Sequence, residues 1–260
     1  MPELTIAHRV CPVLSRTAVG FSDKFEMVKS CAESLYVALE GVQARLVVIL
    51  DGCDERYEKL FPGAEIVKTE SIGNLPTYAR QIEILSNADT EFVYFSEDDY
   101  LYEPDAFKLM LEAIRLPEVD FVTPIDHPDR YDRTMEQNRL SEIIATADRH
   151  WRTVGTTCLT FMTRRETLLK TKRVLSKYAA GTADSVMWLG LTKDSTLNPV
   201  SLVRSTWWMI CRLFGRSVKF WRFLPLFAWR AHGLRLLLGR RYKLWSPLPQ
   251  IAEHLSSDTI

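Results

Sequence analysis

The sequence lacks the features of a secreted or zinc-finger protein. Its five cysteines are scattered and form no C-x-x-C pair, which argues against a disulfide framework and against the usual zinc-ligand spacing. An odd number of cysteines without a framework is typical of a reducing compartment. The chain opens with MPELTIAHRV and has neither the basic start nor the long apolar stretch of a signal peptide. We therefore expect a cytoplasmic protein.

Long uncharged apolar runs are also missing. Residues 207–244 are rich in aromatic side chains, but no window of 18 residues there is free of charge, and a transmembrane helix is therefore disfavoured. Apolar residues make up 47% of the 260 residues and charged residues 25%, which is ordinary soluble usage. Such a chain can bury a sizeable core. It fits one large α/β domain, or a domain of about 200 residues with an appendage.

Acidic residues are absent from one long stretch. Residues 195–250 contain ten Lys and Arg but no Asp or Glu, although the whole chain has 33 basic and 33 acidic residues. The remainder is therefore acidic, and the asymmetry suggests that this stretch meets something anionic. Pro225 is expected to break it into two helices.

Three hypotheses compete for residues 204–243. The first, which we favour, is a membrane-interface segment beside a lipid-linked acceptor. The second is a nucleic-acid patch, for which no RNA or DNA motif is present, and the third is a helical dimer or partner surface. Under the first hypothesis, the interfacial aromatics are Trp207, Trp208, Phe220, Trp221, Phe223, Phe227 and Trp229, and the headgroup contacts are Arg212, Arg216, Lys219, Arg222 and Arg230.

The first half alternates strand-like and helix-like segments, which predicts βαβ units and a mostly parallel sheet. In such sheets the ligand crevice lies beyond the carboxyl ends of the strands. Two apolar strands end in acidic residues, one at Asp51 and the other at Glu97, Asp98 and Asp99. The predicted strands are 4–10, 45–50, 64–68, 91–95 and 119–123, with one or two more in 151–162, and the predicted helices are 23–39, 76–85, 104–114, 166–178 and 184–191.

Three consecutive acids after a buried strand repel one another unless something positive binds there. Carboxylate oxygens suit Mg²⁺ or Mn²⁺, which take phosphate oxygens as further ligands. The alternative is a solvated acidic turn before the helix that begins at Pro104. The position after F-V-Y-F in a βαβ context favours the metal.

The segment TEFVYFSEDDYLYEPDAF resembles the D-x-D segment of type A, nucleotide-sugar-binding, family-two-like glycosyltransferases. The sequence departs from that pattern because Glu97 occupies the first acidic position. The resemblance implies that Asp99 is the metal ligand and that Asp98 lies near the ribose or the sugar, with Glu97 behind them.

Two further segments resemble the same family in the same order. LVVILDGCDE implies that Asp51 contacts the nucleotide base or ribose, and SIGNLPTYARQIEI implies that Arg80 approaches the nucleotide while Gly73 and Asn74 shape a turn. Taken alone, Asp51 is equally well a strand-end cap and Arg80 a surface arginine. The resemblance covers about residues 4–192 and a fragment near the C-terminus.

An inverting transferase of this fold needs a carboxylate to accept the proton of the acceptor hydroxyl. Asp184 in GTADSVMWLG has the expected position at a helix start, where it could instead be an N-cap. Asp194 and Asp126 are lesser candidates. WSPLPQIAEHLSS resembles a family segment whose His completes metal coordination, which makes His254 the candidate, with an exposed terminal His as the alternative.

The sequence therefore predicts a Rossmann-like catalytic domain over residues 1–195 and a basic amphipathic helical segment over residues 196–260 that returns to the active site. The expected activity is Mn²⁺- or Mg²⁺-dependent transfer of a sugar from a UDP- or GDP-sugar to a glycan or lipid-linked hydroxyl, with inversion. The expected location is the cytosolic face of a membrane, and a homo-oligomer is possible. One alternative is a sugar-phosphate nucleotidyltransferase, although HRVCPVLSRT lacks its G-x-G-T-R-type loop. The other is a catalytically degenerate membrane-bound scaffold.

Overall fold

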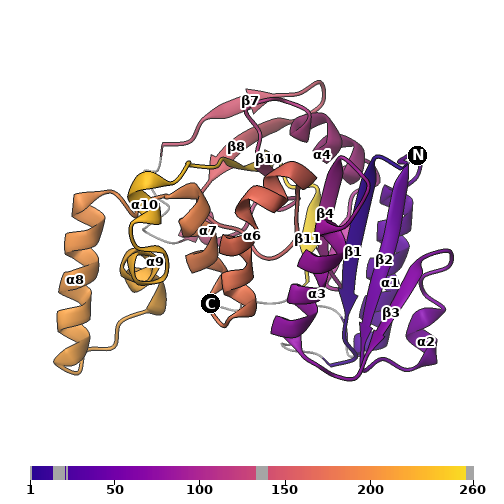
Figure 1. Ribbon diagram of the computed structural model, residues 1–260, viewed down its shortest axis with the longest axis horizontal. Helices are drawn as coiled ribbons and strands as arrows, with labels where there is room; N and C mark the ends of the chain where they lie inside the picture. Colours follow the sequence, from indigo (N-terminus) through magenta and orange to yellow (C-terminus); the bar gives the residue numbers. More distant parts are fainter. Residues whose placement is uncertain (1, 14–20, 22, 133–139, 256–260) are drawn as a thin grey trace.

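A computed structural model describes residues 2–13, 21, 23–132 and 140–255 (Figure 1). Its centre is a nine-stranded sheet with the order β3-β2-β1-β4-β9-β6-β10-β8-β7. The strands are β1 (Leu4–Val10), β2 (Ala44–Asp51), β3 (Glu65–Thr69), β4 (Phe92–Glu97), β6 (Phe121–Val122), β7 (Ile143–Ala145), β8 (His150–Val154), β9 (Phe161–Arg164) and β10 (Leu244–Leu248). A second sheet pairs β5 (Tyr100–Tyr102) with β11 (Ala252–His254).

The central sheet is mostly parallel, as the sequence predicts. The four strands β3, β2, β1 and β4 pair in parallel, and β6 pairs in parallel with β10. Only β9 and β8 run against the others among the described strands, because each pairs antiparallel with both of its neighbours. The fold is therefore α/β, with β1 at the centre of its parallel half.

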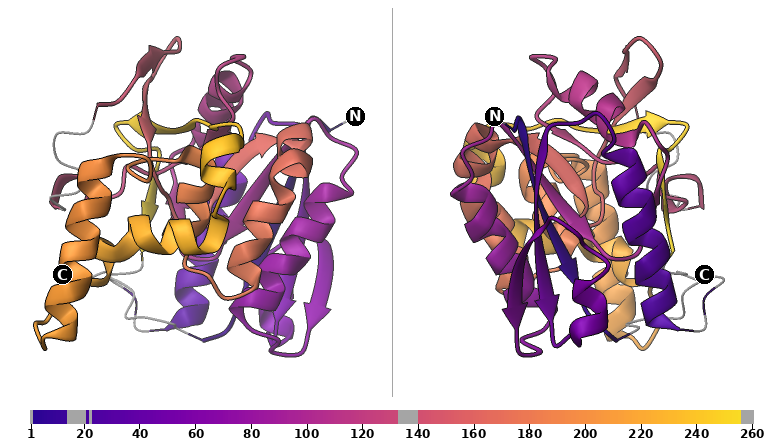
Figure 2. Two further views of the ribbon diagram at one scale, coloured as in Figure 1. Left: turned by 60° about the vertical axis from the view of Figure 1, so that its left-hand side comes forward. Right: turned by 90° about the vertical axis from the view of Figure 1, so that its right-hand side faces the viewer.

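Helices cover both faces of the sheet (Figure 2). Alternate residues of β1 show this, because Leu4 and Ile6 join the core beneath α1 and α4, whereas Ala7 joins the core beneath α3, α6 and α7. Burial on both faces explains why these strands read as continuous apolar runs. The helices are α1 (Lys24–Ala38), α2 (Glu55–Glu58), α3 (Asn74–Ser86), α4 (Ala106–Ile114), α5 (Asp129–Asp132), α6 (Arg165–Ala179) and α7 (Asp184–Thr192).

The C-terminal segment is part of the same folded unit. Strand β10 lies inside the central sheet between β6 and β8. Strand β11 pairs with β5, which directly follows Glu97, Asp98 and Asp99, the acidic cluster. The predicted boundary at residue 195 therefore separates stretches of sequence and not independent folds. The other elements of this segment are α8 (Pro199–Leu213), η1 (Phe220–Phe223), α9 (Leu224–His232) and α10 (Arg235–Leu238).

Two expectations for the C-terminal segment are corrected. Pro225 lies in the first turn of α9, where its missing N–H costs nothing, and the helical break falls earlier, at residues 214–219. Most of the expected interfacial aromatics are not exposed: Phe223 is buried, and the indole of Trp229 donates to the carbonyl of Thr196 over 2.7 Å. Among the described residues, no helix is both long and apolar enough to cross a bilayer.

Candidate functional site

A cavity of about 300 Å³ opens at the carboxyl ends of β1, β2 and β4, next to the start of α3. This is the position that the strand order and the parallel-sheet rule predict. Because β2, β1 and β4 are neighbours, side chains from residues far apart in sequence meet there. The polar side chains that line the cavity are Arg9, Lys24, Asp51, Ser71, Asn74, Thr77, Glu97, Asp98 and Asp99.

Asp51 organises the loop before α3. Its Oδ1 accepts from the Thr69 hydroxyl and from the Ile72 N–H, each over 2.7 Å, and its Oδ2 accepts from the Gly73 N–H over 2.8 Å. Gly73 has φ 90°, a conformation that favours glycine. Asp51 is therefore more than a strand-end cap, because it fixes the turn that delivers Asn74 to the cavity.

Glu97 and Asp98 are neutralised by the chain's own cations. Arg9 donates to Glu97 over 2.6 Å, and Lys24 donates to Asp98 over 2.8 Å, with all four side chains mostly buried. The electrostatic argument for a bound metal at three adjacent acids is corrected at these two positions. Among the described residues, Asp99 pairs with no Lys or Arg, and its ion-pair contact is with His254, which is charged only when protonated.

Asp99 lines the cavity, and His254 on β11 contacts it. The Nε2 atom of His254 is 3.1 Å from Oδ2 of Asp99, and the imidazole stacks on Tyr100 with ring centres 4.7 Å apart. Among the described residues, Oδ1 of Asp99 is buried and has no hydrogen-bond partner. No Lys or Arg of the described chain pairs with this carboxylate. An unpartnered carboxylate oxygen beside an imidazole fits a divalent cation.

The start of α3 faces the cavity through Asn74. The side-chain carbonyl of Asn74 accepts from the Arg9 guanidinium, which also donates to the Asn74 backbone carbonyl over 3.0 Å. Its amide donates to the Tyr178 hydroxyl over 2.9 Å. In the part of the chain that the structure describes, no side chain caps the N-terminus of α3, and a helix N-terminus favours phosphate groups.

Arg80 does not reach this cavity. It is half exposed on α3 and pairs with Glu83 over 2.5 Å on the same helix. The buried face of α3 instead carries Thr77, Tyr78 and Gln81, so residue 80 points to solvent. The structure thus favours the surface-arginine alternative at this position, and the arginine that lines the cavity is Arg9.

Asp184 is the first residue of α7, and Ala183 takes the N-cap position. Its carboxylate accepts from the Ser185 N–H and lies close enough to act electrostatically on the Cys158 thiol. Burial, together with the charges of Asp184 and Glu97, raises the pKa of that thiol well above its usual range. Asp184 is not among the residues that line the cavity, although its charge acts on Cys158, Tyr78 and Tyr178.

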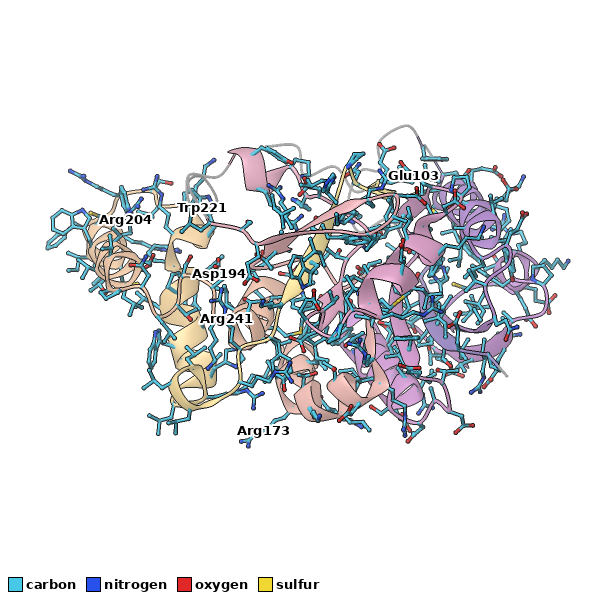
Figure 3. All side chains as sticks on the ribbon, turned by 90° about the horizontal axis from the view of Figure 1, so that it is seen from above. Glu103, Arg173, Asp194, Arg204, Trp221 and Arg241 are labelled. Carbon is cyan, nitrogen blue, oxygen red and sulfur yellow. The ribbon has the colours of Figure 1, made fainter. Side chains whose placement is uncertain are left out.

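The two lesser base candidates lie in other surroundings. Asp126 is mostly buried and accepts from Arg130 over 2.9 Å and from Arg152 over 2.6 Å. Although burial acts to raise the pKa of Asp126, hydrogen bonds from Tyr131 and the two arginines lower it, which makes this carboxylate a weak base. Asp194 follows α7 at the end of the molecule that carries Trp221 (Figure 3).

Sequence analysis missed Arg9 and Lys24, although each left a signal. Arg9 stands in a strand whose seven residues are all buried, so its charge required a buried partner. Lys24 precedes the buried Val28 and Cys31 by four and seven residues on the same face of α1. A cation in line with an apolar stripe indicates an internal ion pair.

No protein-family model matches the sequence, and no curated protein matches it. Solved structures that are similar to the chain include a galactosyltransferase in complex with donor and acceptor sugar analogues, with 13% identity and a TM-score of 0.47, covering 98% of this chain and 87% of that one. A mannosyltransferase from Pyrobaculum calidifontis in complex with GDP-Man and Mn²⁺ has 12% identity and a TM-score of 0.45, covering 92% and 70%. A CMP-2-keto-3-deoxy-manno-octonic acid synthetase complexed with CTP has 17% identity and a TM-score of 0.40, covering 69% and 83%. Both glycosyl- and nucleotidyltransferases are thus similar to this chain, and likeness of this degree does not decide its activity.

Proposed function

We propose that this chain is a metal-dependent glycosyltransferase that moves a sugar from a nucleotide diphosphate sugar to a hydroxyl of a glycan or lipid-linked acceptor. The observation that carries the proposal is the state of Asp99. Among the described residues, it is the one member of the acidic cluster that pairs with no Lys or Arg, and its carboxylate contacts the imidazole of His254. A donor in the cavity would bring its diphosphate to this point.

The nucleoside half of the donor would lie against β2. A carboxylate offers about four acceptor positions, and three of those on Asp51 are taken by the loop before α3. The remaining position can accept from a ribose hydroxyl or a base N–H. The uncapped start of α3 and Arg9 would then face the diphosphate.

Asp99 and His254 would hold Mn²⁺ or Mg²⁺, with diphosphate oxygens as further ligands. When bound, such an ion stabilises the negative charge that develops on the leaving diphosphate. Glu97 and Asp98 serve the cavity differently: paired with Arg9 and Lys24, they fix the walls on either side of Asp99. They add little net charge of their own.

Asp184 would act as the general base. It would take the proton of the acceptor hydroxyl while that oxygen attacks the anomeric carbon from the side opposite the diphosphate, which inverts the configuration. It begins α7 and is not among the residues that line the cavity in which the nucleoside would lie. The acceptor would enter between α7 and the acidic cluster.

The test is hydrolysis of UDP- and GDP-sugars by the purified protein, with and without Mn²⁺. We expect metal-dependent release of the nucleoside diphosphate, which Asp99→Ala abolishes and the exposed control Asp105→Ala leaves unchanged. Release of pyrophosphate from a nucleoside triphosphate and a sugar phosphate would instead identify a nucleotidyltransferase. If neither reaction occurs and no nucleotide sugar raises the melting temperature, the catalytically degenerate scaffold would be the better interpretation.

We also propose that α8 docks on an anionic membrane surface. Val200, Val203, Trp207 and Ile210 recur every three or four residues along it and are 40–70% exposed, and Phe214, which follows, is 83% exposed. This row of five residues is the apolar stripe of α8. Such a face lies flat in a bilayer interface.

The charge around the stripe selects an anionic surface. Arg204, Arg212, Arg216 and Lys219 are exposed on α8 and just beyond it, and residues 195–250 contain no acid. Each such cation contributes roughly 1 kcal/mol near an anionic leaflet. Figure 3 shows Arg204 at the end of the molecule farthest from Glu103.

Co-sedimentation with phosphatidylcholine vesicles, with or without phosphatidylserine, tests this docking. We expect binding only to the anionic vesicles. Raising the salt from about 0.1 M to 1 M should weaken this binding, because the Debye length falls from about 10 Å to about 3 Å. Val203→Ser with Trp207→Ser should reduce binding, and Leu169→Ser, which changes an exposed leucine on α6, should not. Equal binding to neutral vesicles would contradict the proposal, and a dimer that the double variant dissociates would show that the stripe joins two copies.

A further inference from the structure

Three side chains that are not part of the acidic cluster converge beside it. His127, Cys158 and His254 each bring one potential ligand atom within 4.8 Å of the other two. They come from the loop after β6, the loop between β8 and β9, and strand β11. All three are half buried, so an ion from solvent can reach them.

We infer that His127, Cys158 and His254 form a binding site for a thiophilic divalent cation, with Zn²⁺ as the best match. Thiolate and imidazole are the ligands that Zn²⁺ prefers, and three protein ligands leave a fourth position open to water or substrate. This inference goes beyond the proposed transfer, in which Asp99 and His254 hold the metal and His127 and Cys158 have no part.

The ligand atoms are near enough to close on one ion. Tetrahedral ligands about 2.0–2.3 Å from one Zn²⁺ lie roughly 3.3–3.8 Å apart. The three ligand atoms lie within 4.8 Å of one another. Binding must therefore draw the widest pair together by at most about 1.5 Å, which small changes in the side-chain torsions would have to supply.

The backbone next to His127 is firmly held. The preceding residue, Asp126, is almost fully buried and accepts from Arg130 and Arg152. The Asp126 carboxylate is also 3.4 Å from the Ser246 hydroxyl on β10. His127 lies in a loop, but the residue before it is held in place by these contacts.

The other two ligands also have fixed supports. The backbone carbonyl of Cys158 accepts from the Trp188 indole over 3.2 Å. His254 is held in β11, where it pairs with Tyr100 in register and stacks on its ring. Rigid supports of this kind are what a metal site needs to select its ion.

The charge around Cys158 favours a cation. The carboxylates of Asp184, Glu97 and Asp99 all act on the thiol. Lys24 and Arg9 neutralise Asp98 and Glu97, but neither pairs with Asp99. A bound cation would offset this charge and would release the thiol proton, since a coordinated thiol is deprotonated.

His254 is shared between this site and Asp99. An ion held by His127 and Cys158 would occupy the imidazole that the proposed Mn²⁺ or Mg²⁺ needs. Zn²⁺ is therefore expected to inhibit the transferase and to compete with Mn²⁺. That outcome rests on the proposed function, whereas binding of the ion does not.

Cobalt substitution tests the binding directly. The full-length protein, stripped with EDTA, is titrated with Co²⁺ and its absorption is recorded. We expect one Co²⁺ per chain, visible bands of tetrahedral intensity and a near-ultraviolet thiolate-to-cobalt band, all removed by one equivalent of Zn²⁺. A wild-type titration without the thiolate band would overturn the inference.

Variants assign the ligands. Cys158→Ser should remove the thiolate band and weaken Zn²⁺ binding by more than the roughly 100-fold that loss of an outer partner of a ligand costs. His127→Gln should weaken Zn²⁺ binding and keep the thiolate band. Cys53→Ser changes another half-buried thiol and should leave the spectrum intact.

Persistence of the thiolate-to-cobalt band in Cys158→Ser would refute the assignment. Inactivity towards nucleotide sugars with an intact cobalt spectrum would refute only the proposed function.

Discussion

At the scale of single residues, the acidic cluster depends on two buried ion pairs. Lys24 and Asp98 lie 74 positions apart in the sequence, and Arg9 and Glu97 lie 88 apart. Removal of one partner from a buried pair leaves an uncompensated charge, which is far costlier than loss of a surface pair. The two kinds of pair can be compared within this chain.

Lys24→Met should lower the free energy of unfolding by about 3–5 kcal/mol, because among the donors of the described residues Asp98 then keeps only the Cys11 N–H. The matched control is Arg45→Met, which breaks the exposed pair with Glu65 and should cost less than about 1 kcal/mol. Urea denaturation measures both. Equal losses in the two variants would show that the Lys24 pair is not structurally important.

His8 should make stability depend on pH. It is buried and contacts the Ser96 hydroxyl over 2.8 Å, and burial, aided by the charge of Lys24, lowers the pKa of His8 to about 3. In the unfolded chain the imidazole takes up a proton near pH 6.5. Between pH 6.5 and 3 the unfolded state therefore binds more protons.

This one group should reduce the free energy of unfolding by up to about 1.4 kcal/mol for each pH unit below 6.5. Urea midpoints at pH 7.5, 6 and 5 measure the slope. His8→Gln should flatten it, and His150→Gln, at an exposed position, should not. An unchanged slope in His8→Gln would assign the pH dependence to other groups.

Sequence analysis could predict where a residue lies when its place follows from local position, and Asp51 and Asp99 both line the cavity. Asp51 and Asp99 follow apolar strands, and neighbouring parallel strands bring such ends together. The same reasoning could not find the cations that pair with Glu97 and Asp98, because they lie on β1 and α1 and meet the end of β4 only in the folded structure. Arg80 was assigned to the nucleotide from a motif, and the helical face that it occupies was not considered.

At the scale of elements, α7 and α9 pack unusually closely. A methyl group added at Gly190 would overlap the imidazole of His232, whose Nε2 lies 2.9 Å from the Val186 carbonyl. The glycine in α7 thus serves close approach of the second helix. A helical glycine is otherwise less favourable than alanine by about 1 kcal/mol.

Gly190→Ala should destabilise the protein by about 1–3 kcal/mol in spite of its better helix propensity, because the overlap must be relieved by movement of α9. Thermal unfolding of Gly190→Ala, His232→Ala and the double variant measures the coupling. In the His232→Ala background the same substitution should be neutral or stabilising. Additive effects of the two changes would argue against the contact.

The elements of the first half were predictable because buried parallel strands carry continuous apolar runs and the helices between them are amphipathic. The elements of the second half were harder to predict from the sequence. Residues 151–162 predict one or two strands, and they supply most of β8 and the start of β9, which lie on opposite sides of β6 and β10 in the sheet. A run of β-branched residues carries no information about which strand will be its neighbour.

At the scale of the whole molecule, residues 196–260 complete the sheet. Strand β10 pairs with β6 on one side and β8 on the other, and Trp245 is fully buried in the core. A fragment of residues 1–195 should therefore lose cooperative unfolding, because the edges of β6 and β8 are left without partners. Near-ultraviolet circular dichroism and urea titration of the fragment and the full chain measure this, and a sharp transition in the fragment would show that it folds alone.

The place of β10 also affects how the protein is made. While the chain leaves the ribosome, β3, β2, β1 and β4 can pair early, since all their residues precede position 98. The far half of the sheet must wait for about 150 further residues, because β10 is its central strand. During that delay β6, β8 and β9 expose strand edges that other nascent chains can join. Synthesis of this protein should therefore depend on chaperones that cover such edges until translation is nearly complete.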